Sequence, residues 1–128
     1  MDQVFGMDLT KTIIDPEARV LVTGASGFIG ARVVASLLEH GIRRVRCFTR
    51  PSSDFHAVEE LQAQFRSNVE IDVIRGNLLS REDCLKATAG ISVIYHLAIG
   101  GGGKSYPDAF LNAVVATRNL LEASRQHG

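Results

Sequence analysis

Residues 19–30 read RVLVTGASGFIG, a short apolar strand that runs directly into three glycines spaced three apart. An amphipathic helical pattern follows at once. A strand, a glycine-rich turn and a helix in this order place backbone N–H groups at the positive end of a helix, where a phosphate group binds. The stretch therefore predicts a dinucleotide-binding loop.

Each glycine of this stretch has a mechanical role in such a loop. Gly24 permits a tight turn, Gly27 lets the backbone approach a pyrophosphate, and Gly30 allows close packing of the helix against the strand. A structural turn without a ligand is the alternative, because glycine is common in turns. The strand before the glycines and the helix after them favour dinucleotide binding.

Strand and helix patterns alternate along the chain. Apolar runs typical of strands lie at residues 19–23, 45–49, 69–74 and 91–97. Helical periodicity lies between and after them, at about residues 28–41, 54–65, 80–90 and 107–127. Strands separated by helices of this length pair in parallel through right-handed crossovers. We therefore expect an α/β fold with a doubly wound, Rossmann-like parallel sheet, truncated after its fourth strand and the following helix.

Local signals mark the ends of these helices. The first helix is expected to bury Ile29 on its apolar face and to end at Gly41. Asp54 or the serine before it can cap the second helix. Ser80 and Asp83 have the spacing of a capping box before the third helix.

Composition narrows the classes of partner. The chain has 128 residues, with 14 basic and 14 acidic side chains, and no run of like charge suggests a nucleic acid or an anionic membrane surface. Its apolar runs are strand-length, so no membrane span is expected. Cys47 and Cys84 are far apart and are expected to be buried thiols of a cytoplasmic protein. The four histidines share no ligand spacing, so no metal site is expected.

Four segments in order resemble one known family. Residues 23–30, TGASGFIG, resemble the fingerprint of the extended short-chain dehydrogenase/reductases, the NAD(P)-dependent epimerase/dehydratase group. Residues 75–78, RGNL, resemble its Gly-Asp-Leu segment, and residues 95–98, YHLA, its His-Leu-Ala segment. Residues 112–123 resemble its Asn-x-x-x-Thr-x-Asn-Leu-Leu-Glu-Ala helix. The resemblance implies a lead-in segment at residues 1–17 and an incomplete NAD(P)-binding Rossmann domain at residues 18–128.

The resemblance also implies which residues bind the cofactor. The glycine loop and the first helical turn would contribute Gly24, Ser26, Gly27, Phe28, Ile29 and Gly30. Asn77 and Leu78 would lie beside the adenine, and Leu97 and Ala98 beside the ribose and the nicotinamide. Asn77 stands where the family usually has Asp. Its amide oxygen can still accept a hydrogen bond from adenine, and the alternative is a polar strand-end residue that satisfies the loop backbone.

The end of the second strand favours NADP over NAD. NAD-preferring sites place an acidic residue there to hold the ribose diol. Here the strand is followed by Arg50, whose guanidinium suits a 2′-phosphate, and Ser52 and Ser53 could add hydroxyl donors. A solvated arginine at a strand end is the alternative.

The family's catalytic pattern is a Tyr followed four residues later by Lys. Ile99 and Phe110 stand four residues after Tyr95 and Tyr106, so neither tyrosine completes the pattern and no catalytic residue is assigned. We expect the NAD(P)-binding portion of an epimerase, dehydratase or reductase that acts on a carbonyl or sugar-nucleotide substrate, without turnover of its own. A non-catalytic NADP sensor is the alternative. The apolar strand at residues 91–95 would leave an unpaired edge through which the chain self-associates.

A second nucleotide motif also has to be weighed. Residues 98–105, AIGGGGKS, end in Gly-Lys-Ser between a strand and a helix. The P-loop pattern requires glycine where Ala98 stands, and no later strand supplies a carboxylate for Mg²⁺. A loop that borders the nicotinamide pocket is therefore favoured over a site of nucleotide hydrolysis.

Overall fold

Four parallel strands form the main sheet of the computed structural model, which describes residues 3–4, 7–8, 14–65, 68–98 and 105–128. Their order is β5-β4-β3-β6. The strands are β3 (Arg19–Thr23), β4 (Arg44–Thr49), β5 (Glu70–Arg75) and β6 (Val93–His96). The chain builds outward from β3 to β5 and then returns to the other side of β3 as β6. This order is the doubly wound α/β arrangement expected from the sequence.

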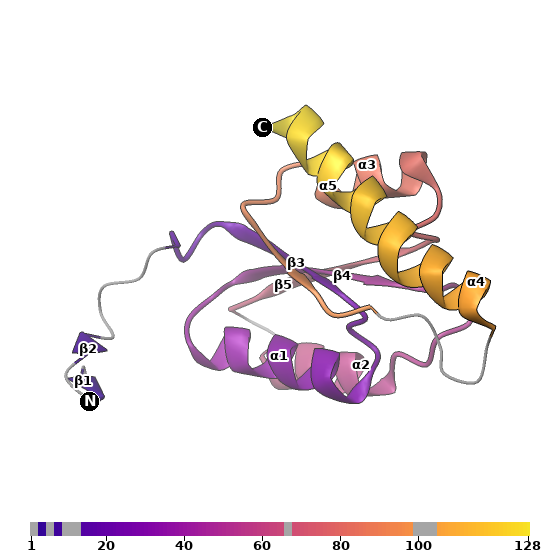
Figure 1. Ribbon diagram of the computed structural model, residues 1–128. Coiled ribbons are helices and arrows are strands. Elements are labelled where there is room, and N and C mark those ends of the chain that lie inside the picture. The colour runs from indigo at the N-terminus through magenta and orange to yellow at the C-terminus, as the bar shows by residue number, and fades with distance from the viewer. Residues whose placement is uncertain (1–2, 5–6, 9–13, 66–67, 99–104) are drawn as a thin grey trace.

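Helices cover both faces of this sheet (Figure 1). Helices α1 (Phe28–Glu39) and α2 (His56–Gln64) lie on one face, and α3 (Arg81–Thr88) and α5 (Ala116–His127) lie on the other. Because both faces are covered, the central strand β3 reads as a nearly continuous apolar run, whereas the edge strand β5 carries charged residues at Glu70, Asp72 and Arg75. The strand order reverses between β3 and β6, and ligands of such sheets bind at that point, beyond the carboxyl ends of the strands.

Two clusters of buried side chains hold the layers together. Val22 and Cys47 lie in the cluster that contains α1 residues, whereas Leu21 and Phe48 lie in the cluster that contains α3 and α5 residues. Cys47 is fully buried, as expected. Burial, with the nearby Asp72 carboxylate, raises the pKa of Cys47 to about 12, so this thiol stays protonated at neutral pH.

A buried arginine joins the sheet to the C-terminal end of α3. Arg46 on β4 is 7% exposed, and its Nε donates to Asp72 Oδ2 at 3.1 Å. Its Nη1 donates to the carbonyl oxygens of Ala87 at 2.9 Å and Ala89 at 2.8 Å. The guanidinium thus satisfies carbonyl groups at a helix C-terminus, where a positive charge is favourable.

The structure corrects several local expectations. Ile29 is not buried: it is 64% exposed in the first turn of α1. Ser80 Oγ accepts from Asp83 N at 3.2 Å, but the Asp83 carboxylate accepts from Asn77 N at 2.8 Å, so it serves the preceding loop. Strand β6 has four residues rather than the seven expected. Its exposed edge is correspondingly shorter.

The C-terminal helix is continuous but not uniform (Figure 1). It comprises α4 (Tyr106–Phe110), the π-helical segment η1 (Leu111–Val115) and α5. The sequence pattern predicted one regular helix over this range. A π segment inserts a wider turn into an α-helix and is frequent at functional sites.

The lead-in segment contains a short antiparallel pair that the sequence did not predict. It comprises β1 (Gln3–Val4) and β2 (Met7–Asp8). In Figure 1 this pair lies apart from the main sheet. Ile14 packs against the core cluster that contains α1 residues, so the part of the lead-in next to β3 belongs to the packed body.

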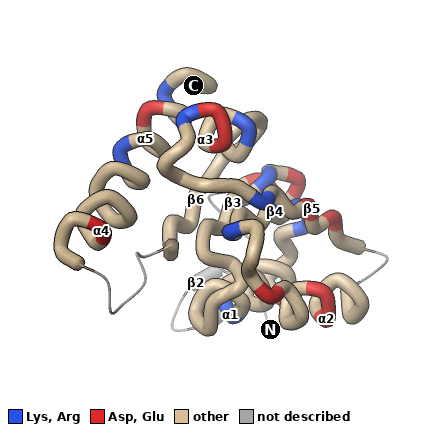
Figure 2. The backbone as a smooth tube through the Cα atoms, turned by 90° about the vertical axis from the view of Figure 1, so that its right-hand side faces the viewer, with Lys and Arg blue, Asp and Glu red and all other residues tan. Residues whose placement is uncertain are grey.

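Charges of both signs are interspersed over the molecule. Figure 2 shows basic and acidic positions side by side on α3 and α5 and again around the strands. Three ion pairs join Arg19 and Arg44 to Glu70, and Arg43 to Glu17, all within 3.4 Å. None of the helices in the described part of the chain combines the length and the apolarity needed to cross a membrane.

Candidate functional site

A pocket of about 480 Å³ lies at the carboxyl ends of the four parallel strands. Its walls come from the loops that follow all four strands and from the C-terminal helix. The lining residues are Gly24, Ser26, Gly27, Phe48, Thr49, Arg50, Ser53, Gly76, Asn77, Leu78, Leu79, Leu97, Ala98, Asn112 and Ala116. The pocket therefore occupies the place at which the strand order reverses.

The three glycines meet different geometric demands. Gly24 has φ +70°, and a Cβ there would lie 2.9 Å from Ala98 N, so both the turn and the close approach of the segment after β6 require glycine. A Cβ on Gly30 would lie 1.9 Å from Gly24 O, which shows that α1 packs directly on the loop. A Cβ on Gly27 would meet only Gly24 O, at 3.3 Å. Gly27 thus leaves its outer side open toward the pocket.

The N-terminus of α1 adjoins this open side. Gly27 is the N-cap, no side chain caps the helix, and its first turn carries no acidic residue. The first N–H groups of a helix have no intrahelical partner and attract anions. Phe28 and Ile29 follow, with 77% and 64% of their surface exposed, and the Arg32 guanidinium lies 4.7 Å from the centroid of the Phe28 ring.

The wall after β4 contains a buried hydroxyl group and an exposed arginine. Thr49 is only 4% exposed, and its Oγ1 has no hydrogen-bond partner among the described residues. Arg50 follows it, exposed, and forms no ion pair within the described ranges. Arg75 fixes this loop because its Nη1 donates to the carbonyl oxygens of Pro51 and Ser53, each at 3.1 Å.

The loop after β5, which forms another wall of the pocket, is hydrogen-bonded to α5. Asn119 is 3% exposed, and its Nδ2 donates to the carbonyl oxygens of Leu78 at 3.0 Å and Leu79 at 3.2 Å. Asn77 Oδ1 accepts from Leu79 N at 2.9 Å. This last bond matches the alternative considered for Asn77, a residue that satisfies the loop backbone. A carboxamide oxygen has two lone pairs, so one remains for a ligand.

The wall after β6 rests on Thr23, which is fully buried at the end of β3. Thr23 Oγ1 accepts from Leu97 N at 3.0 Å and from Ala98 N at 3.2 Å. His96 Nδ1 lies 2.7 Å from the same oxygen, and His96 Nε2 lies 2.9 Å from Thr117 Oγ1 on α5. Desolvation lowers the pKa of His96 below its ordinary value of 6.5, which favours the neutral ring.

Most of the expected cofactor residues meet in one pocket. Those that line it are Gly24, Ser26, Gly27, Arg50, Asn77, Leu78, Leu97 and Ala98. Phe28, Ile29 and Gly30 do not line it: Gly30 packs under the loop, while the first two are exposed beside it. Residues 99–104 of the Gly-Lys-Ser stretch, for which a loop bordering the nicotinamide pocket was favoured over a P-loop, lie outside the described residues. The described residues contain no group of three His, Cys, Asp or Glu side chains that could hold a metal ion.

Sequence reasoning missed Thr49, Thr23 and Asn119 as parts of this site. Thr23 and Asn119 belong to segments that the family pattern does highlight, but their roles depend on which backbone groups lie next to them in space. The doubly wound sheet and the glycine loop define a protein of the Rossmann-like, NAD(P)-binding class.

Comparisons with known proteins give the family. The model of the NAD dependent epimerase/dehydratase family matches residues 20–128. The chain belongs to this family. It is 36% identical over 118 residues to a 3-beta-hydroxysteroid dehydrogenase from Mycolicibacterium neoaurum, in a match that covers 86% of this chain and 29% of that protein.

Solved structures agree. A UDP-glucuronic acid 4-epimerase from Bacillus cereus, in complex with UDP-glucuronic acid and NAD, matches with TM-score 0.64 and 31% identity, over 82% of this chain and 35% of that one. A uronate dehydrogenase from Agrobacterium tumefaciens shares the fold, with TM-score 0.68 and 22% identity over 89% and 38% of the two chains. The chain thus spans about a third of the length of these proteins.

Proposed function

We propose that the pocket binds a nicotinamide dinucleotide, with its pyrophosphate over the N-terminus of α1. The observation that carries this proposal is Gly27, whose outer side is open where an uncapped helix presents its N–H groups to the pocket. Any side chain at this position would occupy the space that a phosphate needs. The adenosine would lie between the ends of β4 and β5, and the nicotinamide toward Leu97 and Ala98. The bound dinucleotide would supply hydride chemistry, which these residues only position.

NADP is the proposed cofactor, rather than NAD. The end of β4 carries no carboxylate to hold a ribose diol, and Arg50 lines the pocket without an ion pair among the described residues. A guanidinium and a phosphate form strong, charge-assisted hydrogen bonds. The buried Thr49 hydroxyl beside it still needs a partner, and a ligand hydroxyl or phosphate oxygen would meet that need.

Calorimetric titration of the 128-residue chain tests this proposal. NADP⁺ is expected to bind more tightly than NAD⁺, and ATP with Mg²⁺ is expected to bind weakly, because only the first ligand satisfies both the helix terminus and Arg50. Replacement of Arg50 by Met should weaken NADP⁺ binding about tenfold or more and leave NAD⁺ binding nearly unchanged. Arg43, exposed and outside the pocket, provides the matched control variant Arg43→Met. If the wild-type chain bound NADP⁺ and NAD⁺ with equal affinity, the proposed preference for NADP would be wrong.

A second variant, at the residue before Arg50, tests whether the adenosine ribose lies at the end of β4. Thr49→Asp places a carboxylate at the end of β4, where NAD-preferring sites hold the ribose diol. The substitution should shift preference toward NAD⁺, because the new charge repels a 2′-phosphate and accepts hydrogen bonds from a diol. An unchanged preference, in a variant that still binds and melts cooperatively, would place the adenosine ribose elsewhere.

We further propose that this chain is the cofactor-binding portion of a cytoplasmic enzyme that acts on a carbonyl or sugar-nucleotide substrate, and that these 128 residues alone are catalytically incomplete. The relatives named above act on steroids or sugar derivatives according to their names. Neither tyrosine is followed four residues later by Lys. An assay with NADPH and a keto-steroid or a UDP-sugar should show binding without turnover, and turnover above background would contradict incompleteness.

A non-catalytic NADP sensor remains the second candidate, because cofactor binding does not depend on the missing pair. It predicts that a partner protein binds the NADP-loaded chain and not the free chain. A Tyr-x-x-x-Lys pattern encoded in frame beyond Gly128 would decide for the enzyme.

A further inference from the structure

A series of hydrogen bonds connects two walls of the pocket across the fold. One wall is the end of β6, with Leu97 and Ala98, and the other is the C-terminal helix, with Asn112 and Ala116. Thr23, His96 and Thr117 connect them. Neither the glycine loop nor the cofactor contacts proposed above involve these three side chains.

The donors and acceptors along these hydrogen bonds can be assigned in only one consistent way. Thr117 Oγ1 lies within hydrogen-bond distance of the Ala113 carbonyl oxygen, which can only accept, so the Thr117 hydroxyl donates there. His96 Nε2 must then be the donor to Thr117 Oγ1, at 2.9 Å. Thr23 Oγ1 already accepts from two backbone N–H groups, so its own hydrogen goes to His96 Nδ1, at 2.7 Å.

Under this assignment, the geometry of the wall after β6 depends on the protonation of the His96 ring. A neutral ring protonated on Nε2 completes every bond. A ring protonated on both nitrogens would direct a third donor at Thr23 Oγ1, which has no lone pair left for it. Thr23 Oγ1 would have to release either Leu97 N, which also donates to the Thr23 carbonyl oxygen at 3.3 Å, or Ala98 N, the atom that a Cβ on Gly24 would approach to 2.9 Å.

The surroundings of His96 bring no charged side chain to the ring among the described residues. Thr23 is its contact on β3, and Thr117 its contact on α5. The segment η1 carries no titratable residue. On α5, Arg118 and Glu122 are exposed and pair with each other at 4.0 Å. On β6, Tyr95 packs against the cluster on the opposite face of the sheet.

We propose that His96 is a positioning residue of the dinucleotide site, which holds Thr23 and the Leu97–Ala98 backbone against the glycine loop and ties them to the pocket-lining helix through Thr117. This inference rests on the proposed cofactor function. It assigns His96 no contact with the ligand. It predicts that dinucleotide affinity depends on the neutral, Nε2-protonated ring.

The tautomer can be measured without any ligand. Nitrogen-15 NMR of the histidine rings, recorded at a pH above 6.5, should show His96 as the neutral tautomer with Nε2 protonated and Nδ1 unprotonated. His40, whose Nδ1 lies 2.7 Å from the Ser36 carbonyl oxygen and therefore donates to it, should show the opposite tautomer and serves as an internal reference. A His96 ring protonated on Nδ1 would overturn the proposal.

A matched pair of threonine variants separates positioning from stability. Thr117→Val removes the acceptor of His96 Nε2, whereas Thr88→Val removes a comparable hydroxyl that donates to a carbonyl four residues earlier, on α3 and outside the pocket. Thr117→Val should weaken NADP⁺ binding about five- to tenfold, while Thr88→Val should leave it unchanged although it also lowers the melting temperature. If Thr117→Val and Thr88→Val bound NADP⁺ with equal affinity, His96 would have no positioning role and the proposal would be wrong.

The pH profile provides the last readout. As the pH is lowered below 6.5, through the range in which the buried His96 ring takes up its second proton, wild-type affinity should fall by a larger factor than the affinity of His96→Asn, whose side chain does not titrate but whose oxygen can still accept from Thr23. The 2′-phosphate of NADP⁺ also titrates in this range, and it does so equally in both proteins. His40→Asn should behave as the wild type. A wild-type profile equal to that of His96→Asn, down to a pH at which the NMR spectrum shows both His96 ring nitrogens protonated, would contradict the proposal. A wild type that binds no dinucleotide at any pH would overturn the proposed function, whatever the tautomer of His96.

Discussion

Gly27 and Gly30 are alike in sequence but not in what surrounds them. A Cβ on Gly30 would collide with Gly24 O at 1.9 Å, whereas a Cβ on Gly27 would meet the same oxygen at 3.3 Å and otherwise face the pocket. Gly30→Ala should therefore lower the free energy of unfolding by about 2–3 kcal/mol, because loop and helix must separate.

Gly27→Ala should lower the free energy of unfolding by less than about 1 kcal/mol, since its N-cap φ of −76° suits any residue. It should nevertheless abolish dinucleotide binding. Chemical denaturation and calorimetric titration of both variants check this contrast. A Gly27→Ala protein that binds NADP⁺ as the wild type does would show that the pyrophosphate lies elsewhere.

At this scale the sequence predicted the roles that depend on local conformation. The glycine turn and the position of Arg50 after β4 could be read directly, because turns and strand ends are local features, while the role of Arg50 toward a 2′-phosphate stays a prediction. Thr49 and Asn119 could not. Thr49 matters because its hydroxyl is buried without a partner, and Asn119 because it reaches two carbonyl groups about forty residues away in sequence. Such roles arise from burial and long-range contacts.

Among the elements, β4 and α3 are joined through Arg46. Replacement of Arg46 by Met keeps the aliphatic bulk but leaves the Ala87 and Ala89 carbonyl groups and Asp72 without their donor. We expect the free energy of unfolding to fall by about 2–4 kcal/mol, because buried acceptors lose their partners.

The matched control for this variant is Arg43→Met. Arg43 pairs with Glu17 at 3.4 Å, both side chains are more than half exposed, and exposed pairs contribute about 0–1 kcal/mol. Urea denaturation of the two variants compares them directly. Similar losses in both would mean that the buried guanidinium contributes no more than an exposed one.

Elements differ in how well their patterns predict them. Strand β3 was predicted because a parallel sheet covered on both faces requires apolar runs, and this run is unambiguous in Val20–Val22. Strand β4 was predicted from Val45, Cys47 and Phe48, although Arg46 interrupts its apolar run. Strand β6 came out shorter because apolarity extends beyond the residues that pair with β3. The antiparallel pair of the lead-in has two residues in each strand, too few to establish a periodicity.

For the whole molecule, the burial of Cys47 predicts a loss of stability in alkali. Its pKa is raised from 9.0 to about 12 in the folded protein. Above pH 9.0 the unfolded chain therefore loses this proton while the folded chain keeps it, and the free energy of unfolding decreases as the pH rises. The slope should approach about 1.4 kcal/mol per pH unit until the folded thiol also ionises.

Denaturation at a series of alkaline pH values measures this slope. Cys47→Ala should have a lower stability at neutral pH but lack this contribution to the slope. An identical alkaline slope in the wild type and in Cys47→Ala would contradict the assignment. The comparison of slopes, rather than of absolute stabilities, isolates the thiol from the cavity that the substitution creates.

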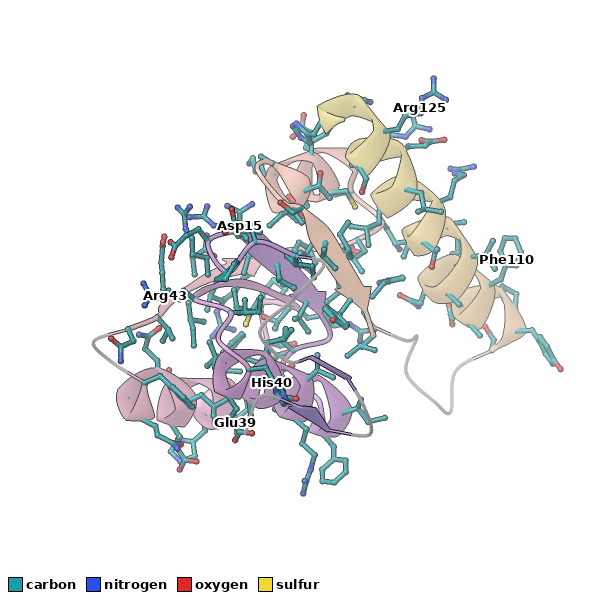
Figure 3. The ribbon with its side chains drawn as sticks, turned by 90° about the vertical axis from the view of Figure 1, so that its left-hand side faces the viewer. Asp15, Glu39, His40, Arg43, Phe110 and Arg125 are labelled. Carbon is teal, nitrogen blue, oxygen red and sulfur yellow. The ribbon has the colours of Figure 1, made fainter. Side chains whose placement is uncertain are left out.

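Two surfaces bear on association between whole molecules. Among the described strands β6 pairs with β3 alone, and Phe110 on α4 is 58% exposed and projects away from the sheet (Figure 3). We predict that the 128-residue chain self-associates through the β6 edge, since an unpaired strand presents free N–H and C=O groups. Backbone amides of β6 should become more protected from hydrogen exchange as protein concentration rises.

The variant Phe110→Gln separates the two surfaces. Association through β6 should persist in it, with the same concentration dependence in sedimentation experiments. Loss of association in Phe110→Gln would show that the molecules associate through α4 rather than through β6. A wild-type chain that stays monomeric at tens of micromolar would contradict self-association altogether.

The π-helical segment η1 has a consequence for spacing along the C-terminal helix. Asn112 precedes Thr117 by five positions. In a regular α-helix, with about 100° of rotation per residue, two residues five positions apart point about 140° apart. A π turn joins residues five apart by its backbone hydrogen bonds, so the wider turn of Leu111–Val115 reduces this divergence: Asn112 lines the pocket, and Thr117 on α5 reaches His96. One continuous helix thereby supplies both a pocket-lining side chain and a contact to β6.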